Sequence, residues 1–194
     1  FDAISVREDD GLKFIPNAVH LLDPVFLADT DIFHKLADSV KTPKCKVVGY
    51  VLDKTDEHFD KNIAYENISV EEYLSYIKNA ELVVTDSFHG TCFAILFNRP
   101  FVTLGNAHRG NSRFESLFRD LEITDTKNPD WNAINKRIEK RRNQGIKWLK
   151  TVLSDNNIKN IELRNKLKAR GFVKNKKHKK VSFVKKIFSI DKHG

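Results

Sequence analysis

Three short apolar runs between residues 46 and 104 predict buried β-strands. They read KVVGYVL from Lys46 to Leu52, LVVT from Leu82 to Thr85, and FVTL from Phe101 to Leu104. Runs of this length without polar alternation are typical of strands covered on both faces, as in a parallel sheet. A fourth short strand, from Ala3 to Val6, ends in Arg7-Glu8. The pattern therefore predicts a mostly parallel sheet.

Apolar residues between and after these strands recur at helical spacing. The clearest helix start is SVEE, a capping box in which Ser69 and Glu72 can satisfy each other's backbone amides. The run from Ser87 to Phe97 is apolar almost all round, which predicts a helix buried on most sides. The Asp23-Pro24 step favours an extended or turn conformation over helix. Three further helices are predicted over residues 31–40, 111–121 and 131–153.

The order of these elements predicts the fold class. Strand, helix and strand between Leu82 and Leu104 form a tight βαβ unit, whose crossover should be right-handed. We therefore expect an α/β domain with an open, mostly parallel Rossmann-like sheet flanked by helices. After about Asn156 the composition becomes basic. This change divides the chain into an α/β domain over residues 1–155 and a basic, partly helical tail over residues 156–194.

The net charge of +8 is unevenly distributed. Residues 164–194 contain twelve Lys and Arg against one acid, Asp191, so this segment carries +11. Residues 1–163 therefore carry −3, the difference between +8 and +11. A mildly acidic body without a basic stripe predicts that the domain does not bind nucleic acid.

The composition also limits the kinds of site and the cellular location that we expect for this protein. Cys45 and Cys92 have no metal-ligand spacing, and no carboxylate cluster appears, so we expect neither a disulfide framework, a metal site nor a cofactor. No apolar run reaches the roughly 18 residues of a membrane span, and a reducing cytoplasm is the expected location. The chain begins with Phe1 and contains no Met. We therefore expect a piece of a longer protein, in which a site shared with an upstream domain is half present.

The segment TDSFHG directly follows the strand that ends at Thr85 and opens the next helix. In such sheets ligands bind at the carboxyl ends of strands, beside helix N-termini. Asp86 or Thr85 can cap the helix, leaving nearby amides and the helix dipole to bind an anion. Gly90 has no side chain to block a close approach, and His89 lies in the same turn. The simpler interpretation is a structural cap and a bystander histidine.

Other polar groups follow neighbouring strands and strengthen the prediction of a ligand site. Arg7 ends the first strand, and the segment NAHRGNSRF after the third strand supplies Arg109, Ser112 and Arg113. If these strand ends converge, their cations suit a ligand that carries phosphate or carboxylate. Taken singly, Arg7 and Arg113 could equally form surface ion pairs.

Three ordered blocks over about residues 1–123 resemble the polysaccharide pyruvyl transferase family. The longest is TDSFHGTCFAILFNRPFVTL followed by RGNSRFESLFRDLEI, and the others are FDAISVREDDG and LLDPVFLAD. The resemblance implies one half of a GT-B-like fold, the C-terminal domain of a two-domain enzyme. The sequence differs from the usual family pattern between Leu52 and Ser69, where family members usually have a longer segment with another helix and strand.

The resemblance also implies an activity. The family transfers the carboxyethylidene group of phosphoenolpyruvate to a sugar, forming a pyruvate ketal and releasing phosphate. By this resemblance Arg7 clamps the carboxylate or phosphate of the donor, and His89 contacts the phosphate or protonates the methylene carbon. Asp86 and Ser87 would shape the loop and offer amides, and Arg113 is a weaker anion ligand. The implied acceptor is a sugar or lipid-linked oligosaccharide of a cell-surface polysaccharide.

The last segment of the tail suits a membrane surface. Val181, Phe183, Val184, Ile187, Phe188 and Ile190 fall on one half of a helical wheel, opposite Lys and Ser. A basic amphipathic helix of this kind is typical of binding to anionic lipid, so residues 174–190 predict peripheral attachment at the inner face of a membrane. A solubilising tail is the simpler interpretation.

Two other functions fit the same sequence. A GT-B glycosyltransferase could hold the diphosphate of a nucleotide sugar at the same strand ends. A noncatalytic remnant, tethered by its basic tail, would bind no donor and would be indifferent to the loss of His89.

Overall fold

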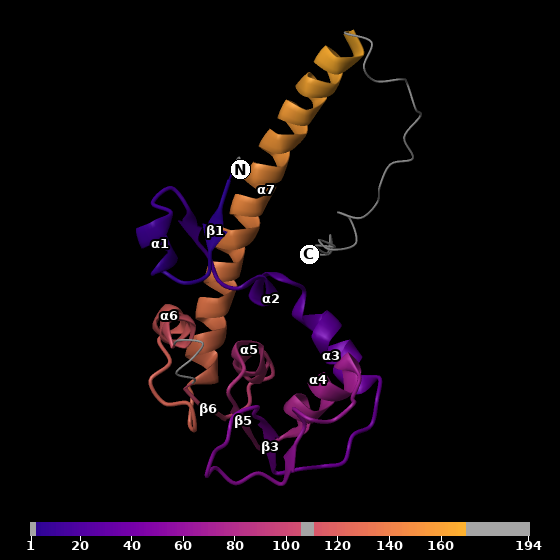
Figure 1. Ribbon diagram of the computed structural model, residues 1–194, viewed down its shortest axis with the longest axis vertical. Coiled ribbons are helices and arrows are strands. Elements are labelled where there is room, and N and C mark those ends of the chain that lie inside the picture. Colours follow the sequence, from indigo (N-terminus) through magenta and orange to yellow (C-terminus); the bar gives the residue numbers. More distant parts are fainter. Residues whose placement is uncertain (1–2, 106–110, 170–194) are drawn as a thin grey trace.

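The computed structural model describes residues 3–105 and 111–169 and contains two parallel sheets with helices packed around them (Figure 1). The strands are β1 (Ser5–Val6), β2 (Val19–His20), β3 (Val47–Tyr50), β4 (Lys61–Asn62), β5 (Leu82–Thr85) and β6 (Phe101–Thr103). The helices are α1 (Gly11–Phe14), α2 (Pro24–Leu27), α3 (Thr30–Asp38), α4 (Val70–Asn79), α5 (Phe88–Leu96), α6 (Ser112–Leu121) and α7 (Trp131–Ala169). The predicted α/β class with parallel strands is confirmed.

The larger sheet has the strand order β4-β3-β5-β6, and every pair in it is parallel. The chain leaves β3 towards β4 on one side, whereas it leaves β5 towards β6 on the other. Neighbouring strands whose connections diverge in this way create a crevice at their carboxyl ends, where open α/β sheets bind ligands. This switch point lies between Tyr50 and Thr85, which are register partners.

The N-terminal strand does not join this sheet. In the described part of the chain, β1 pairs only with β2, in parallel, with Ser5 opposite Val19. The sequence predicts that the ends of three strands, β1, β5 and β6, converge. This prediction is correct only in part, because β5 and β6 belong to the larger sheet whereas β1 belongs to the smaller one. Sequence patterning could show that residues 3–6 are extended, but not which strand would pair with them.

Helix α5 is the centre of the core, as its apolar sequence predicts. It packs against β5, β6, α4 and α2, and Cys92, Ala94 and Ile95 are completely buried. Helix α4 begins with the predicted capping box: Ser69 N donates to Glu72 Oε2 at 2.8 Å, and Glu72 N donates to Ser69 Oγ at 3.1 Å. Figure 1 shows α3 and α4 beside α5 on the same side of the larger sheet.

Helix α7 is longer than its sequence pattern predicts. It continues from Trp131 to Ala169, so the predicted boundary between residues 155 and 156 falls inside one helix. Figure 1 shows it running past α2 and β1 and away from the larger sheet. The helix is mostly polar, and no helix in the described part of the chain is both long and apolar enough to cross a membrane. The predicted membrane-binding segment, residues 174–190, lies outside the described residues.

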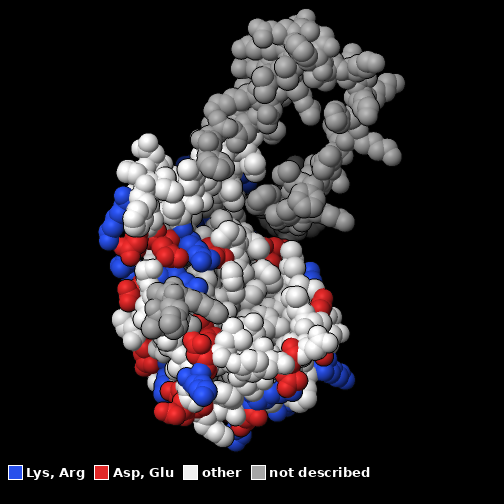
Figure 2. All heavy atoms as spheres, viewed as in Figure 1, with Lys and Arg blue, Asp and Glu red and all other residues white. Residues whose placement is uncertain are grey.

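The surface of the body carries charges of both signs. On the face displayed in Figure 2, Lys and Arg side chains lie side by side with Asp and Glu. Among the described residues, charges of the body form ion pairs, including Lys78 with Asp38 and Arg137 with Glu122. On this face the charge of the body is thus mixed rather than gathered into a basic stripe.

Candidate functional site

The turn between β5 and α5 is held by hydroxyl groups. Ser87 is the N-cap of α5, and its Oγ accepts a hydrogen bond from Gly90 N at 3.3 Å. The prediction that Asp86 or Thr85 caps this helix is wrong. Thr85 is still in the strand, where its hydroxyl donates to Tyr50 O at 2.9 Å and accepts from Ser87 N at 3.0 Å. The turn therefore ties the ends of β3 and β5 to the start of α5.

Asp86 is buried and fixes the neighbouring strand end. Its Oδ2 accepts from Leu52 N at 2.9 Å and from Asp53 N at 3.1 Å, just after β3. The side chain is 1% exposed. Asp86 therefore shapes the loop after β3, as the predicted loop-shaping role suggests, but its carboxylate binds the end of β3 and not the start of α5.

Gly90 is required by packing within the turn. A Cβ added to Gly90 would lie 2.5 Å from Thr85 Oγ1, closer than real Cβ contacts come. The Thr85 hydroxyl therefore occupies the space in which a Gly90 side chain would lie, the space that the sequence suggests is open to a ligand. A role of the Gly90 amide in ligand binding stays a prediction.

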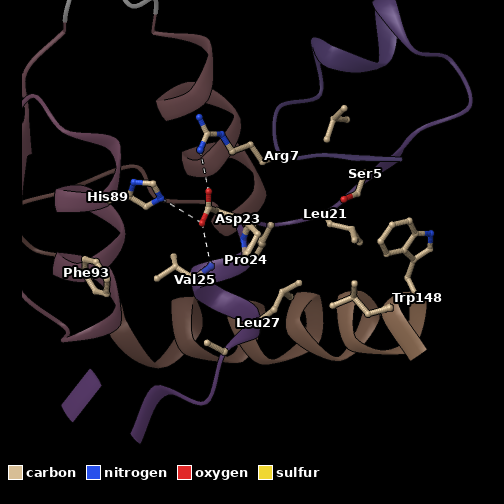
Figure 3. Close-up of a pocket in the computed structure, with 14 residues that line it drawn as sticks. Ser5, Arg7, Leu21, Asp23, Pro24, Val25, Leu27, His89, Phe93 and Trp148 are labelled. Atoms are coloured by element: carbon tan, nitrogen blue, oxygen red, sulfur yellow. Dashed lines mark hydrogen bonds and ion pairs between the residues drawn. The ribbon is translucent and has the colours of Figure 1, made fainter. Parts of the chain in front are cut away.

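Arg7 and His89, far apart in the sequence, meet at the carboxylate of Asp23. Arg7 NH1 donates to Asp23 Oδ2 at 3.0 Å, and His89 Nε2 lies 3.7 Å from Asp23 Oδ1. Figure 3 shows the three side chains pointing towards one another from the segment after β1, the start of α2 and the first turn of α5. The structure thus brings together the two residues predicted to be catalytic.

Asp23 is the residue that the sequence analysis did not identify as part of the site. It is the N-cap of α2, accepting from Val25 N at 3.0 Å, and Pro24 occupies the first turn of that helix. Asp23 is extended as predicted, but a helix begins directly after it. An Asp before a Pro at the first helical position is a known start signal, and this signal could have located it.

The Arg7 guanidinium is enclosed by opposite charge and an aromatic ring. Its Nε lies 3.4 Å from Glu8 Oε1, and its Cζ lies 4.6 Å from the centroid of the Phe88 ring. Partial burial tends to lower the pKa of Arg7, but the hydrogen bond and charge of Asp23, then those of Glu8, outweigh it and raise the pKa above its ordinary value. Arg7 is therefore a fixed positive charge at any physiological pH.

A cavity of about 930 Å³ opens beside this cluster. Arg7, Asp23 and His89 line one end, while the side chains of Leu27, Phe93 and Trp148 give the remainder an apolar wall. The site therefore combines one polar end, which could hold an anion, with an apolar wall formed by α2, α5 and α7.

A family model described as polysaccharide pyruvyl transferase matches residues 1–108. The chain belongs to this family. No curated protein and no solved structure matches the chain. The matched range contains Arg7, Asp23 and His89, so the cluster lies within the part of the chain that the family model covers.

The remaining predicted site residues follow the matched range. Ser112, at the start of α6, donates to Glu8 Oε2 at 3.0 Å, so Glu8 links it to Arg7. The Arg113 guanidinium lies 5.0 Å from the centroid of the Phe114 ring. Arg109 lies outside the described residues. Within the described part of the chain, no three His, Cys, Asp or Glu side chains are grouped to hold a metal ion.

The two thiols of the chain, Cys45 and Cys92, should react very differently. Cys92 is buried under the cluster, and burial, followed by the charge of Asp23, raises its pKa well above the ordinary value, whereas Cys45 is only partly buried. We expect the folded chain at pH 8 to expose one reactive thiol to a disulfide reagent such as DTNB, and the second only after unfolding. Cys45→Ser should abolish the fast reaction. Two fast thiols would contradict the burial of Cys92.

The burial of Cys92 should also make the free energy of unfolding depend on pH. Above about pH 8.5 the unfolded chain loses the Cys92 proton, whereas the folded chain retains it, so the free energy of unfolding should fall as pH rises from there. Urea unfolding at neutral and alkaline pH would measure this fall, which Cys92→Ala should reduce.

Proposed function

We propose that the Arg7–Asp23–His89 cluster is the donor site of a phosphoenolpyruvate-dependent pyruvyl transferase that modifies a sugar of a cell-surface polysaccharide or its precursor. The observation that carries the proposal is the convergence of Arg7 and His89 on one buried carboxylate at the edge of a cavity. Membership of the pyruvyl transferase family supplies the reaction class.

Arg7 is suited to hold the carboxylate or phosphate of the donor. A guanidinium presents several donors in one plane and can therefore bind such anions with paired hydrogen bonds. Asp23 and Glu8 already balance its charge, so the donor needs further positive potential. The first-turn amides of Phe88 and His89 have no intrahelical acceptor and add the positive end of the α5 dipole.

His89 is suited to transfer a proton. Its side chain is 56% exposed, so a ligand in the cavity can reach it, and Asp23 lies on its Nε2 side. Protonation of the methylene carbon of phosphoenolpyruvate makes the phosphate-bearing carbon electrophilic. One sugar hydroxyl attacks that carbon, phosphate leaves with the electrons of its C–O bond, and a second hydroxyl closes the ketal. Of the two protons that the hydroxyls lose, one restores the acid form of His89 and the other leaves with the phosphate. Asp23 acts as a positioning residue, because it holds Arg7 and faces His89.

Calorimetric titration of phosphoenolpyruvate into the full chain tests this proposal. We expect wild type to bind, and Arg7→Ala and His89→Ala each to bind at least tenfold more weakly, because a charge-assisted contact contributes about 1.5–3 kcal/mol. Circular dichroism should show that both variants remain folded.

Matched controls are Arg137→Ala, which removes a half-buried, ion-paired arginine of α7, and His58→Ala, in the exposed loop after β3. Both should bind as wild type does. A nucleotide sugar titrated in parallel should give no heat; base-dependent binding of the nucleotide sugar would instead favour a glycosyltransferase. No binding of either donor by the folded chain would contradict the proposal and favour a noncatalytic remnant.

A further inference from the structure

A second cavity, of about 260 Å³, lies at the switch point of the larger sheet. We call it the switch-point cavity. Its walls come from the carboxyl ends of β3, β5 and β6 and from the segments that follow them: Val51, Asp53, Lys54, Thr55, Asp86, Thr103, Leu104 and Gly105. It shares no lining residue with the cavity beside His89. The position is where open α/β sheets bind ligands, yet the donor cluster leaves it unused.

One buried atom in this wall lacks a partner. Asp86 Oδ2 accepts two backbone amides, but Asp86 Oδ1 is buried and has no hydrogen-bond partner among the described residues. Buried carboxylate oxygens are costly when they accept nothing. A water molecule or a ligand hydroxyl in the cavity that Asp86 lines can supply the hydrogen bond that the described residues do not give to Oδ1.

The other walls define the chemistry of that donor. Lys54, on the exposed rim, donates hydrogen bonds, and the Thr55 and Thr103 hydroxyls can donate or accept. Val51 and Leu104 add apolar surface. The lining also includes Asp53, so a simple anion would be repelled by two acidic residues. Among the described residues, no three His, Cys, Asp or Glu side chains are grouped to hold a metal ion there. A sugar ring matches the whole set, because its hydroxyls both donate and accept while its C–H face is apolar.

We infer that the switch-point cavity binds one sugar ring of the acceptor, with Asp86 Oδ1 accepting hydrogen bonds from its hydroxyls. The identification of this sugar with the acceptor rests on the proposed function. Because the two cavities share no residue, Asp86 is a binding residue for the sugar and does not contact the donor. Its loss should weaken sugar binding and leave phosphoenolpyruvate binding unchanged.

Asp86→Asn is a sharp test because it preserves the fold. The amide oxygen of Asn can still accept from Leu52 N and Asp53 N, while its NH₂ group replaces the unpartnered acceptor with a donor. Asp60→Asn is the matched control. Asp60 Oδ2 accepts from Lys46 N at 2.7 Å and Val47 N at 3.1 Å, the same arrangement at the other end of β3, but on the exposed surface. Lys54→Ala is a second test on the exposed rim that leaves the core intact.

The measurement is a nitrogen-15 NMR titration of the full chain with the methyl glycosides of glucose, galactose and mannose. We expect at least one glycoside to shift the amide signals of Lys54, Thr55 and Leu104. Binding should weaken at least tenfold in Asp86→Asn and measurably in Lys54→Ala, and should be unchanged in Asp60→Asn.

Two results would overturn the inference: no glycoside shifts these signals, or magnesium shifts them while glycosides do not. A parallel phosphoenolpyruvate titration separates this inference from the proposed function. Donor binding without any sugar binding would overturn the sugar site alone. Sugar binding that needs Asp86, without donor binding, would support the sugar site and contradict the donor site.

Discussion

Replacing Asp23 by alanine should destabilise the folded chain by about 2–4 kcal/mol, more than a typical substitution. The Asp23 side chain is 6% exposed and accepts from Arg7 and from Val25 N. Its removal leaves the Arg7 guanidinium without its closest counter-charge and the first turn of α2 without its cap. Because Arg7 is 38% exposed, water can replace part of the lost ion pair, which keeps the cost below that of a fully buried pair.

A matched control separates the ion pair from the helix cap. Asp29 caps α3 in the same way, accepting from Asp31 N at 3.1 Å, but it has no arginine partner among the described contacts. Asp29→Ala should therefore cost only about 1 kcal/mol, the usual value of an N-cap. Asp23→Asn, which keeps an oxygen for Val25 N, should fall between the two alanine variants.

Urea unfolding followed by circular dichroism measures these free energies. The double variant Arg7→Met/Asp23→Ala should cost less than the sum of its single variants, since removing Arg7 also removes the charge that Asp23 balances. If Asp23→Ala costs no more than Asp29→Ala, the Arg7–Asp23 contact contributes nothing measurable. The central link of the cluster would then be absent in solution.

The parallel sheet could be predicted because its strands are short, apolar and separated by helical patterns. β5 has the predicted bounds, Leu82–Thr85, and α4 begins with the predicted capping box at Ser69. The pairing of β1 with β2 could not be predicted, because residues 3–6 and 18–20 carry no signal that selects a partner strand. A partly helical tail could be predicted, but its unbroken continuation of α7 to Ala169 could not, because the polar run from Ser154 to Asn157 is typical of a helix end.

The candidate site shows the same division between local and long-range information. Arg7 and His89 can be predicted as site residues because each follows a strand and matches a short motif of the family that the sequence resembles, and both are local properties. That both meet at Asp23 is a tertiary property, because α2 places the carboxylate between segments distant in sequence. The cap of α5 was assigned to the wrong residue because Thr85, Asp86 and Ser87 all have side chains that can cap, and only the backbone decides among them.

Replacing Gly90 by alanine should have the second large effect, about 1–3 kcal/mol of destabilisation, although alanine normally favours helix. The added Cβ would lie 2.5 Å from Thr85 Oγ1 and 3.2 Å from Thr85 Cβ. Thr85 cannot move aside, because it is completely buried and its hydroxyl bonds both Tyr50 O and Ser87 N. The first turn of α5 must shift instead, and it carries His89. Gly90→Ala should therefore also weaken phosphoenolpyruvate binding.

Gly145→Ala is the matched control for this prediction, because Gly145 also lies in a helix and its added Cβ also meets a neighbour. That neighbour is the Leu27 side chain, with Cδ2 at 2.6 Å, and a leucine tip can rotate away where the Thr85 hydroxyl cannot. The gain of up to about 1 kcal/mol in helix propensity should then offset the contact. Urea unfolding should show a clear loss of stability for Gly90→Ala and almost none for Gly145→Ala.

The double variant Thr85→Ala/Gly90→Ala should cost less than the two single variants together, since without the Thr85 hydroxyl the new methyl group has room. Equal stability of Gly90→Ala and wild type would mean that the turn can yield, and that His89 is held less rigidly than the contact with Thr85 implies.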